Sequence, residues 1–219
     1  SGPYLGSLLL ESVHHPRQEE ELKPGIIKLT ALNDGVSERV KEQYEKSPYP
    51  RWRVNKEKQR SALPAAHILD GIGCANGLDR DILAGAPKIL VAGCGTGQHS
   101  LGVHSRYIHS GVDAFDICET SLAYAIRKTN ELRIEDLNYY QADINLIADW
   151  AKRFDLIECC GVLHHLASPM KGWRNLEALL NPGGLMKIAL YSSRARQGFN
   201  DFRQEMSRFI ENLDLNEMR

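Results

Sequence analysis

The residues with the clearest chemical potential are three glycines at positions 93, 95 and 97, which follow the apolar run Ile89–Ala92. Glycine lets the backbone adopt positive φ and lets a ligand approach without meeting a Cβ. A helix is expected to begin near Gln98, so its unpaired N–H groups and partial positive charge should face the same turn. The segment therefore predicts a binding site for a small molecule.

The spacing of these glycines disfavours a diphosphate ligand. A dinucleotide site typically has Gly-x-Gly-x-x-Gly, and Gln98 stands where the third glycine of that pattern would fall. No Gly-Lys-Ser/Thr follows, so the phosphate-loop pattern fails as well. A nicotinamide-dependent oxidoreductase is the less favoured alternative on these grounds.

Two aspartates follow predicted strands and have the right chemistry for a nucleoside. Asp116 ends the second strand of this region, where a carboxylate can accept hydrogen bonds from both ribose hydroxyls. Asp113 competes for that role, but alternation puts it on the opposite face. Asp143 follows the third strand, within reach of an adenine amino group. The alternative for both Asp116 and Asp143 is capping of the next helix.

His164 and His165 are the candidate general bases, should the reaction need one. Adjacent residues face different ways, so the pair is poorly suited to chelation, and a packing role is the alternative. The histidines at 99, 104 and 109 are five residues apart, a spacing that builds no shared helical face. We therefore expect no metal site.

The elements that must position these residues alternate between strand and helix. Such alternation predicts an α/β fold with a doubly wound, mostly parallel sheet, whose ligands bind at the carboxyl ends of the strands. The expected strands are 89–92, 111–116, 138–142, 154–160 and 185–191. The expected helices are 98–107, 121–132, 146–152, 169–180 and 199–209.

Three regions are expected along the chain. Residues 1–60 form an N-terminal extension or lid, with a helix over 37–46 and a proline-rich turn. Residues 61–195 form the ligand-binding domain, and residues 196–219 a C-terminal helix, with a truncated end as an open alternative. Tyr44, Tyr49 and Trp52 are aromatic candidates for the lid, with ordinary packing as the equal alternative.

Composition excludes several classes of protein. The 27 basic and 28 acidic side chains nearly balance, which supports neither a general nucleic-acid binder nor a membrane-surface binder. No apolar run reaches membrane-spanning length. Five cysteines without a Cys-x-x-Cys pair suggest neither a disulfide framework nor a thiolate zinc site, so a cytoplasmic protein with mostly buried, apolar cysteines is expected.

Taken together, the motifs resemble those of class I S-adenosylmethionine-dependent methyltransferases. The similar segments are the family's first motif at 89–97, its ribose segment at 115–125, its adenine segment at 141–144, its fourth-strand motif at 154–166 and the turn before its fifth strand at 181–185. Residues 42–45 and 47–52, together with 121–128, are also similar to methyltransferase domains that often follow tetratricopeptide repeats.

The resemblance implies S-adenosylmethionine as cofactor, S-adenosylhomocysteine as product, and an in-line methyl transfer to an acceptor that is a small molecule or a protein. The implied cofactor-binding residues are Gly93, Cys94, Gly95, Gly97, Gln98, Asp116, Ile117, Asp143, Ile144, Cys160 and, in the lid, Tyr44. The family sheet has two more strands, which this sequence is expected to lack. A non-catalytic S-adenosylmethionine-binding subunit that needs a partner or a missing segment is therefore the alternative. The oligomeric state stays open.

Overall fold

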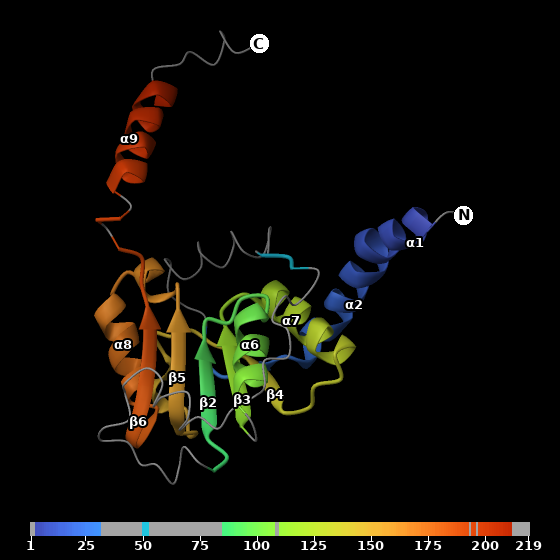
Figure 1. Cartoon of the computed structure of the whole chain (residues 1–219), viewed down its shortest axis with the longest axis horizontal. Helices are drawn as coiled ribbons and strands as arrows, with labels where there is room; N and C mark the ends of the chain where they lie inside the picture. Colours follow the sequence, from blue (N-terminus) through green and yellow to red (C-terminus); the bar gives the residue numbers. More distant parts are fainter. Residues whose placement is uncertain are drawn as a thin grey trace.

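Six parallel strands form a single sheet in the order β1-β4-β3-β2-β5-β6 (Figure 1). The computed structural model describes residues 3–31, 50–52, 85–107, 110–192, 194–195 and 197–211. The strands are β1 (Ile27–Lys28), β2 (Lys88–Ala92), β3 (Gly111–Asp116), β4 (Leu137–Gln141), β5 (Phe154–Cys160) and β6 (Leu180–Ala189). The order reverses between β2 and β5, which confirms the doubly wound, parallel α/β fold that the sequence predicts.

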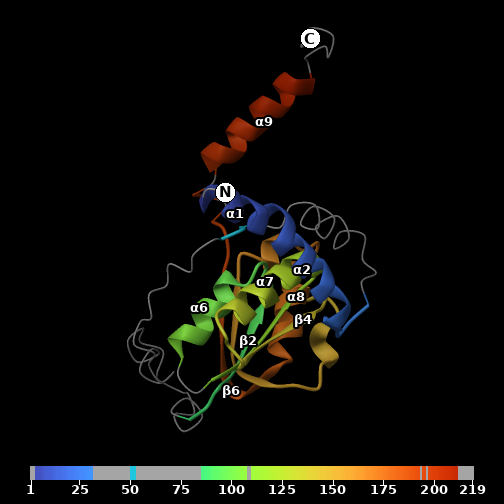
Figure 2. The same cartoon turned by 90° about the vertical axis from the view of Figure 1, so that its right-hand side faces the viewer.

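Helices cover both faces of this sheet. Helices α6, α7 and α2 lie on one face and α8 on the other, whereas α9 projects away from the sheet (Figures 1 and 2). The helices are α1 (Pro3–Leu9), the π-helical turn η1 (Leu10–His14), α2 (His15–Leu22), α6 (Gln98–Arg106), α7 (Glu119–Glu131), α8 (Pro169–Glu177) and α9 (Gln197–Glu211), with 3₁₀ turns η2 (Lys23–Gly25), η3 (Ile147–Asp149) and η4 (Leu163–His165). No helix in the described ranges is long and apolar enough to cross a membrane.

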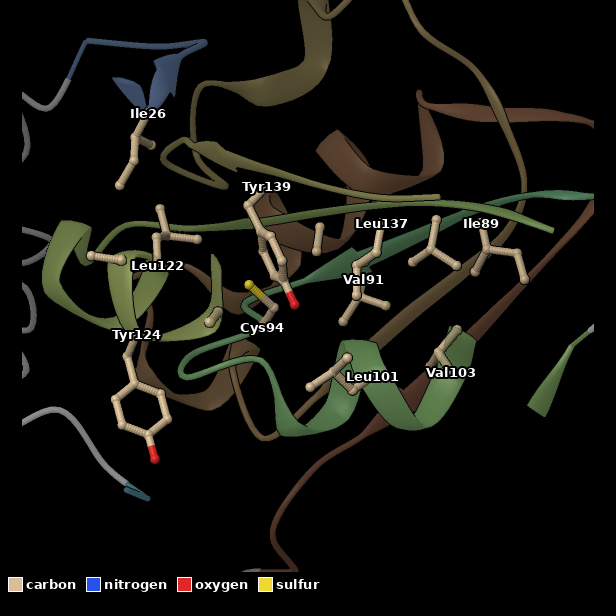
Figure 3. Packing of buried hydrophobic residues seen from close by; sticks show 14 of the residues in the cluster. Ile26, Ile89, Val91, Cys94, Leu101, Val103, Leu122, Tyr124, Leu137 and Tyr139 are labelled. Carbon is tan, nitrogen blue, oxygen red and sulfur yellow. The ribbon is translucent and has the colours of Figure 1, made fainter. Parts of the chain in front are cut away.

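The central strand β2 divides the core into two apolar layers. Ile89 and Val91 face one layer, where Leu101 and Val103 of α6 pack against them (Figure 3). Leu90 and its neighbour Ala92 face the other layer with α8. The side chains of residues 89–92 are fully buried, because a parallel sheet with helices on both sides exposes neither face.

A buried hydroxyl joins α6 and α7 to β4. The phenol oxygen of Tyr139 lies 3.0 Å from Ser100 Oγ and 3.1 Å from Thr129 Oγ1. Burial raises the pKa of Tyr139, so the phenol stays neutral and both contacts are ordinary hydrogen bonds. The hydroxyl is satisfied, and it fixes the two helices relative to the sheet.

Three details differ from the sequence-based expectation. The expected helix 146–152 is only the 3₁₀ turn η3, because helical geometry there is limited to Ile147–Asp149. Strand β1 is a sixth parallel strand, in which Ile27 pairs with Tyr140 of β4; two residues carry no alternating pattern that would reveal it. Helix α8 ends at Glu177 rather than at 180, and the predicted turn 181–184 lies within the bounds of β6. The register shifts there, where Gly183 has a φ of +77°, so that pairing resumes at Leu185. The predicted helix 37–46 lies outside the described residues.

The N-terminal helix α2 is fastened to α7 by a buried charge. Glu19 is 2% exposed, and its carboxylate accepts hydrogen bonds from Arg127 Nε at 3.0 Å and from Arg51 Nη2 at 3.1 Å. Two guanidinium groups compensate the desolvated carboxylate, and the three residues come from three separate segments. The contact therefore holds residues 50–52 as well as α2 against the sheet domain.

We predict that Glu19→Gln destabilises the fold by about 3 kcal/mol, because the substitution removes the buried partner of Arg127 and leaves that guanidinium only the half-exposed Glu131. The free energy of unfolding in urea measures this effect. Glu21→Gln on the same helix is the matched control, since its partner Arg17 is exposed, and a change below about 0.5 kcal/mol is expected. Equal effects of the two substitutions would contradict a structural role for the Glu19 contact.

Candidate functional site

A cavity of about 370 Å³ opens at the carboxyl ends of the central strands. Its walls come from the segments that follow four neighbouring strands, at 93–96, 115–117, 142–144 and 160–162. Parallel strands bring their carboxyl ends to one edge, and the reversal of strand order between β2 and β5 leaves a crevice there. The position and size are typical of a small-molecule site.

The glycine turn after β2 gives the cavity its open backbone. The N–H groups of Gly93 and Cys94 both donate to the carbonyl of Phe115, at 2.8 and 3.0 Å, which folds the turn onto β3. Gly95 has a φ of +52°, and a Cβ at this residue would meet no atom within 4 Å. Gly95 is therefore where a ligand can approach the backbone.

The two outer glycines of the turn are required by packing. A Cβ at Gly93 would lie 2.3 Å from Val162, and a Cβ at Gly97 would lie 2.7 Å from Ala125 of α7. Gly97 has a φ of +84° and does not line the cavity. It allows α6 to begin close against α7, which is the packing role of the third glycine in a dinucleotide site. A ligand contact at Gly97 is thus not supported by its position.

Asp116 lines the cavity and also braces its walls. Its carboxylate accepts hydrogen bonds from the N–H of Gly95 at 2.8 Å and from the N–H of Cys118 at 2.9 Å. Cys118 is the N-cap residue of α7, so part of the expected capping role is present. Asp113 instead binds Lys152 at 2.7 Å and lies outside the cavity lining. Alternation along β3 thus separates the two aspartates, as predicted.

Asp143 presents a buried oxygen to the same cavity. Its Oδ1 accepts the N–H of Asn145 at 2.8 Å, and its own N–H donates to Thr30 Oγ1 at 2.8 Å. Its Oδ2 is buried and has no hydrogen-bond partner within the described part of the chain. A buried carboxylate oxygen without a partner is costly, so this atom marks a position for a ligand donor.

The two candidate catalytic histidines take different positions. His165 lies at the end of η4, is exposed, and lines the cavity. His164 lies outside the lining, and its ring packs between His165 and Tyr191, with ring centroids 4.1 and 4.3 Å apart. The packing interpretation therefore fits His164 and leaves His165 as the candidate base. Gln98, Ile117, Ile144 and Cys160 also line the cavity, and Tyr44 lies outside the described residues.

Residues 50–52 cover one side of the cavity. Pro50 lines it, and the Pro50 carbonyl accepts the Thr96 hydroxyl at 2.7 Å. Trp52 donates from Nε1 to the Thr96 carbonyl at 2.9 Å, and its own carbonyl accepts the Tyr124 hydroxyl. Trp52 is buried against the core and does not reach the cavity. Trp52 therefore has the packing role, whereas Pro50, two residues before it, lines the site.

Sequence reasoning missed a charged cluster below one wall. Glu158 of β5 is fully buried, and its carboxylate lies 2.9 Å from His99 Nε2, 3.1 Å from Arg106 Nη1 and 2.9 Å from Lys187 Nζ. Burial opposes ionisation of Glu158, but hydrogen bonds from His99 and Lys187 hold its pKa down at about 2. Burial also opposes charging of His99, yet hydrogen bonds with Cys160 and Glu158 raise the His99 pKa to about 9. A glutamate among the apolar residues Leu156, Ile157 and Cys159 of a buried strand is the signal that points to this cluster.

Residues 89–184 match the sequence model of a family described as "Methyltransferase domain". An uncharacterized protein of Synechococcus is 30% identical over 172 residues, which are 76% of this chain and 40% of that protein. A ubiquinone biosynthesis O-methyltransferase of Coxiella burnetii is 30% identical over 109 residues, 49% of this chain and 44% of the relative. The chain thus spans about two fifths of the length of these curated relatives.

Solved structures share the fold. The cyclase SpnF has a TM-score of 0.50 at 20% identity, over 69% of this chain and 59% of SpnF. PKMT2 of Rickettsia typhi, solved in complex with AdoHcy, has a TM-score of 0.51 at 23% identity, over 56% of this chain and 24% of that protein. The sheet is therefore Rossmann-like, as in these solved structures.

We predict different effects for alanine at two glycines of the turn. Gly97→Ala should destabilise the fold by about 3 kcal/mol, because it adds a clash with Ala125 to the strain of a positive φ. Gly95→Ala, at an open position, should cost only about 1 kcal/mol from backbone strain. Urea unfolding of both variants measures the difference, and equal losses would contradict a packing role for Gly97.

The contacts of His99 with Cys160 and Glu158 should make stability depend on pH in the alkaline range. The folded-state pKa of His99 lies above that of an ordinary imidazole, so its contribution is complete below pH 6.5 and is lost as the pH rises to about 9. The loss amounts to at most about 3 kcal/mol. Unfolding at a series of pH values measures it; His99→Gln should flatten this slope, whereas His104→Gln on the same helix should leave it unchanged.

Proposed function

We propose that this chain binds S-adenosylmethionine in the cavity and transfers its methyl group to an acceptor. The observation that carries the proposal is the pair of carboxylates at the ends of adjacent strands, Asp116 of β3 and Asp143 after β4, beside the open backbone of Gly95. Hydroxyl and amino donors of a nucleoside need such acceptors, and a large apolar wall suits its ring.

The residues present fit this cofactor. The Asp143 Oδ2 that lacks a partner in the described structure would accept a hydrogen bond from the adenine amino group. Asp116 would accept hydrogen bonds from the ribose hydroxyls, since a carboxylate has about four acceptor sites in total. The beginning of α6, with Gln98 and His99 lining the cavity, would favour the methionine carboxylate. The bound cofactor would supply an activated methyl group on a sulfonium.

The protein's share of the chemistry is alignment and exclusion of water. In-line displacement at a methyl group needs little acid–base help, so a rigid pocket contributes most of the effect. The contacts at Thr96 hold Pro50 over the cavity and so shield the bound group. A protic acceptor would lose its proton to His165, which lines the cavity and is exposed.

We propose oxygen as the acceptor atom, on a small molecule or a protein. Two relatives support this choice by name: the ubiquinone biosynthesis enzyme of Coxiella burnetii and a malonyl-acyl carrier protein O-methyltransferase of Paenibacillus, the latter 27% identical over 107 residues. Within the methyltransferases, we propose a relation to the domains that follow tetratricopeptide repeats, and the similarity of residues 42–45, 47–52 and 121–128 to those domains supports it. A non-catalytic S-adenosylmethionine-binding subunit is the alternative, and binding without turnover, even with partners present, would favour it.

Asp143→Asn tests the cofactor assignment. The new amide keeps an acceptor for Asn145 but can place its NH₂ group against the adenine amino group, so affinity for S-adenosylhomocysteine should fall about 10- to 100-fold. The folded state should lose no stability, because the substitution removes a buried oxygen that has no partner among the described residues. Titration calorimetry and urea unfolding measure the two effects.

Asp136→Asn is the matched control for this titration, because Asp136 is exposed in the loop before β4 and should not alter affinity. NAD serves as the second ligand. Binding of NAD but not of S-adenosylhomocysteine by the unsubstituted protein would contradict the proposal and favour the oxidoreductase alternative.

A further inference from the structure

A cysteine of the cavity wall lies beside the buried charge cluster described above. We infer that Cys160 is a reactive modification site, whose thiol attacks soft electrophiles and hydroperoxides that enter the cavity. The inference goes beyond methyl transfer, because it concerns chemistry at sulfur that needs neither the cofactor nor an acceptor.

The geometry brings three reactive groups together at the end of β5. A ring nitrogen of His99, a carboxylate oxygen of Glu158 and the Cys160 sulfur all lie within 4.8 Å of one another. Cys160 is half-buried and lines the cavity, as does His99, whereas Glu158 is fully buried behind them. A thiol, an imidazole and a carboxylate at these distances can together activate a cysteine nucleophile.

The charges around His99 come from three elements. Glu158 and Cys160 of β5 lie beside His99. Glu158 is itself contacted by Arg106 and Tyr107 at the end of α6 and by Lys187 of β6. The hydrogen bond with His99 lowers the pKa of the Cys160 thiol against the opposing effect of burial. The negative charge of Glu158 in turn favours the imidazolium form of His99. The pair therefore favours a thiolate beside an imidazolium.

The other described cysteines are in different surroundings. Cys94, Cys118 and Cys159 are buried, and burial raises the pKa of the Cys94 and Cys159 thiols, that of Cys159 to about 12. Sulfur reacts as the thiolate, so these residues should be slow. They provide internal references for the labelling of Cys160 within the same molecule.

A divalent cation is the competing occupant of this cluster, since imidazole, thiolate and carboxylate are zinc ligands. Glu158 already accepts hydrogen bonds from Arg106 and Lys187 as well as from the His99 side, so a dication would stand close to two fixed positive charges. This charge balance favours a proton on His99 over a metal ion.

The reactions balance at the cluster. With iodoacetamide, a sulfur–carbon bond forms, the carbon–iodine bond breaks, and iodide leaves. With a hydroperoxide, sulfur attacks one oxygen and the oxygen–oxygen bond breaks; the departing alkoxide takes the proton of His99 and leaves as an alcohol. Sulfur is oxidised by two electrons to a sulfenic acid and the hydroperoxide is reduced.

Labelling of the intact protein by iodoacetamide, followed by peptide mass spectrometry, tests the inference. At pH 7, Cys160 should react at least about tenfold faster than Cys94, Cys118 and Cys159. Its rate should also become half-maximal at a pH below the value of 9.0 that is ordinary for a cysteine. Hydrogen peroxide should yield a sulfenic acid at Cys160 ahead of the three buried thiols. Equal rates at Cys94, Cys118, Cys159 and Cys160, or a midpoint at or above 9.0, would overturn the inference.

Two histidine variants separate activation from simple exposure. His99→Gln should slow labelling of Cys160 at least about fivefold at pH 7, with the two rates converging at pH 10, where the thiol ionises without help. His104→Gln, on the same helix but outside the cavity lining, should label like the unsubstituted protein. Equal rates for His99→Gln and the unsubstituted protein at pH 7 would show that exposure alone sets the reactivity.

Two additions extend the test. A chelator should leave the labelling rate unchanged, and faster labelling after chelation would show that a metal occupies the cluster instead. Saturating S-adenosylhomocysteine should slow labelling of Cys160, and this arm alone rests on the proposed function. A ligand that binds by calorimetry without protecting Cys160 would contradict its placement in the occupied pocket, whereas no binding at all would contradict only the proposed function.

Discussion

The hydrogen bonds of one carboxylate, that of Asp116, hold the rest of the site in place. Its two oxygens accept the N–H groups of Gly95 and Cys118, so the turn after β2 and the start of α7 cannot move independently. Both segments line or support the cavity, and the same side chain faces its interior. Asp116 therefore both faces the ligand site and fixes the two segments around it. The pocket is preorganised, so little conformational entropy is lost when a ligand binds.

Buried charge is the second constraint, and it appears twice. Glu158 lies behind the pocket wall and Glu19 behind the segment that covers the pocket, and each is compensated by cations from other elements. Such contacts contribute little net stability, but an incorrect arrangement would leave a charge buried without a partner. They therefore act mainly by selecting one relative placement of α2, α6, β5 and β6.

The sequence predicted what depends on local pattern. The apolar strands, the glycine turn and the aspartates at strand ends could be read because parallel strands deliver their carboxyl ends to one edge. The packing role of Gly97 could not be predicted from the sequence, because it depends on Ala125 in a helix that comes later in the chain. The link between His99 and Glu158 spans 59 residues, and strand β1 has only two residues, so neither leaves a periodic signal.

The contacts that fasten the N-terminal segment also set an order of folding. Glu19 meets Arg127 across 108 residues, and Thr30 meets Asp143 across 113. The entropy cost of closing such long loops is met only after β3, α7 and β4 have formed. Residues 3–31 must therefore wait for their docking surface. Until then Ile26, which is buried in the core of the folded protein, lacks the residues that cover it, and this is the interval in which a chaperone would have most to bind.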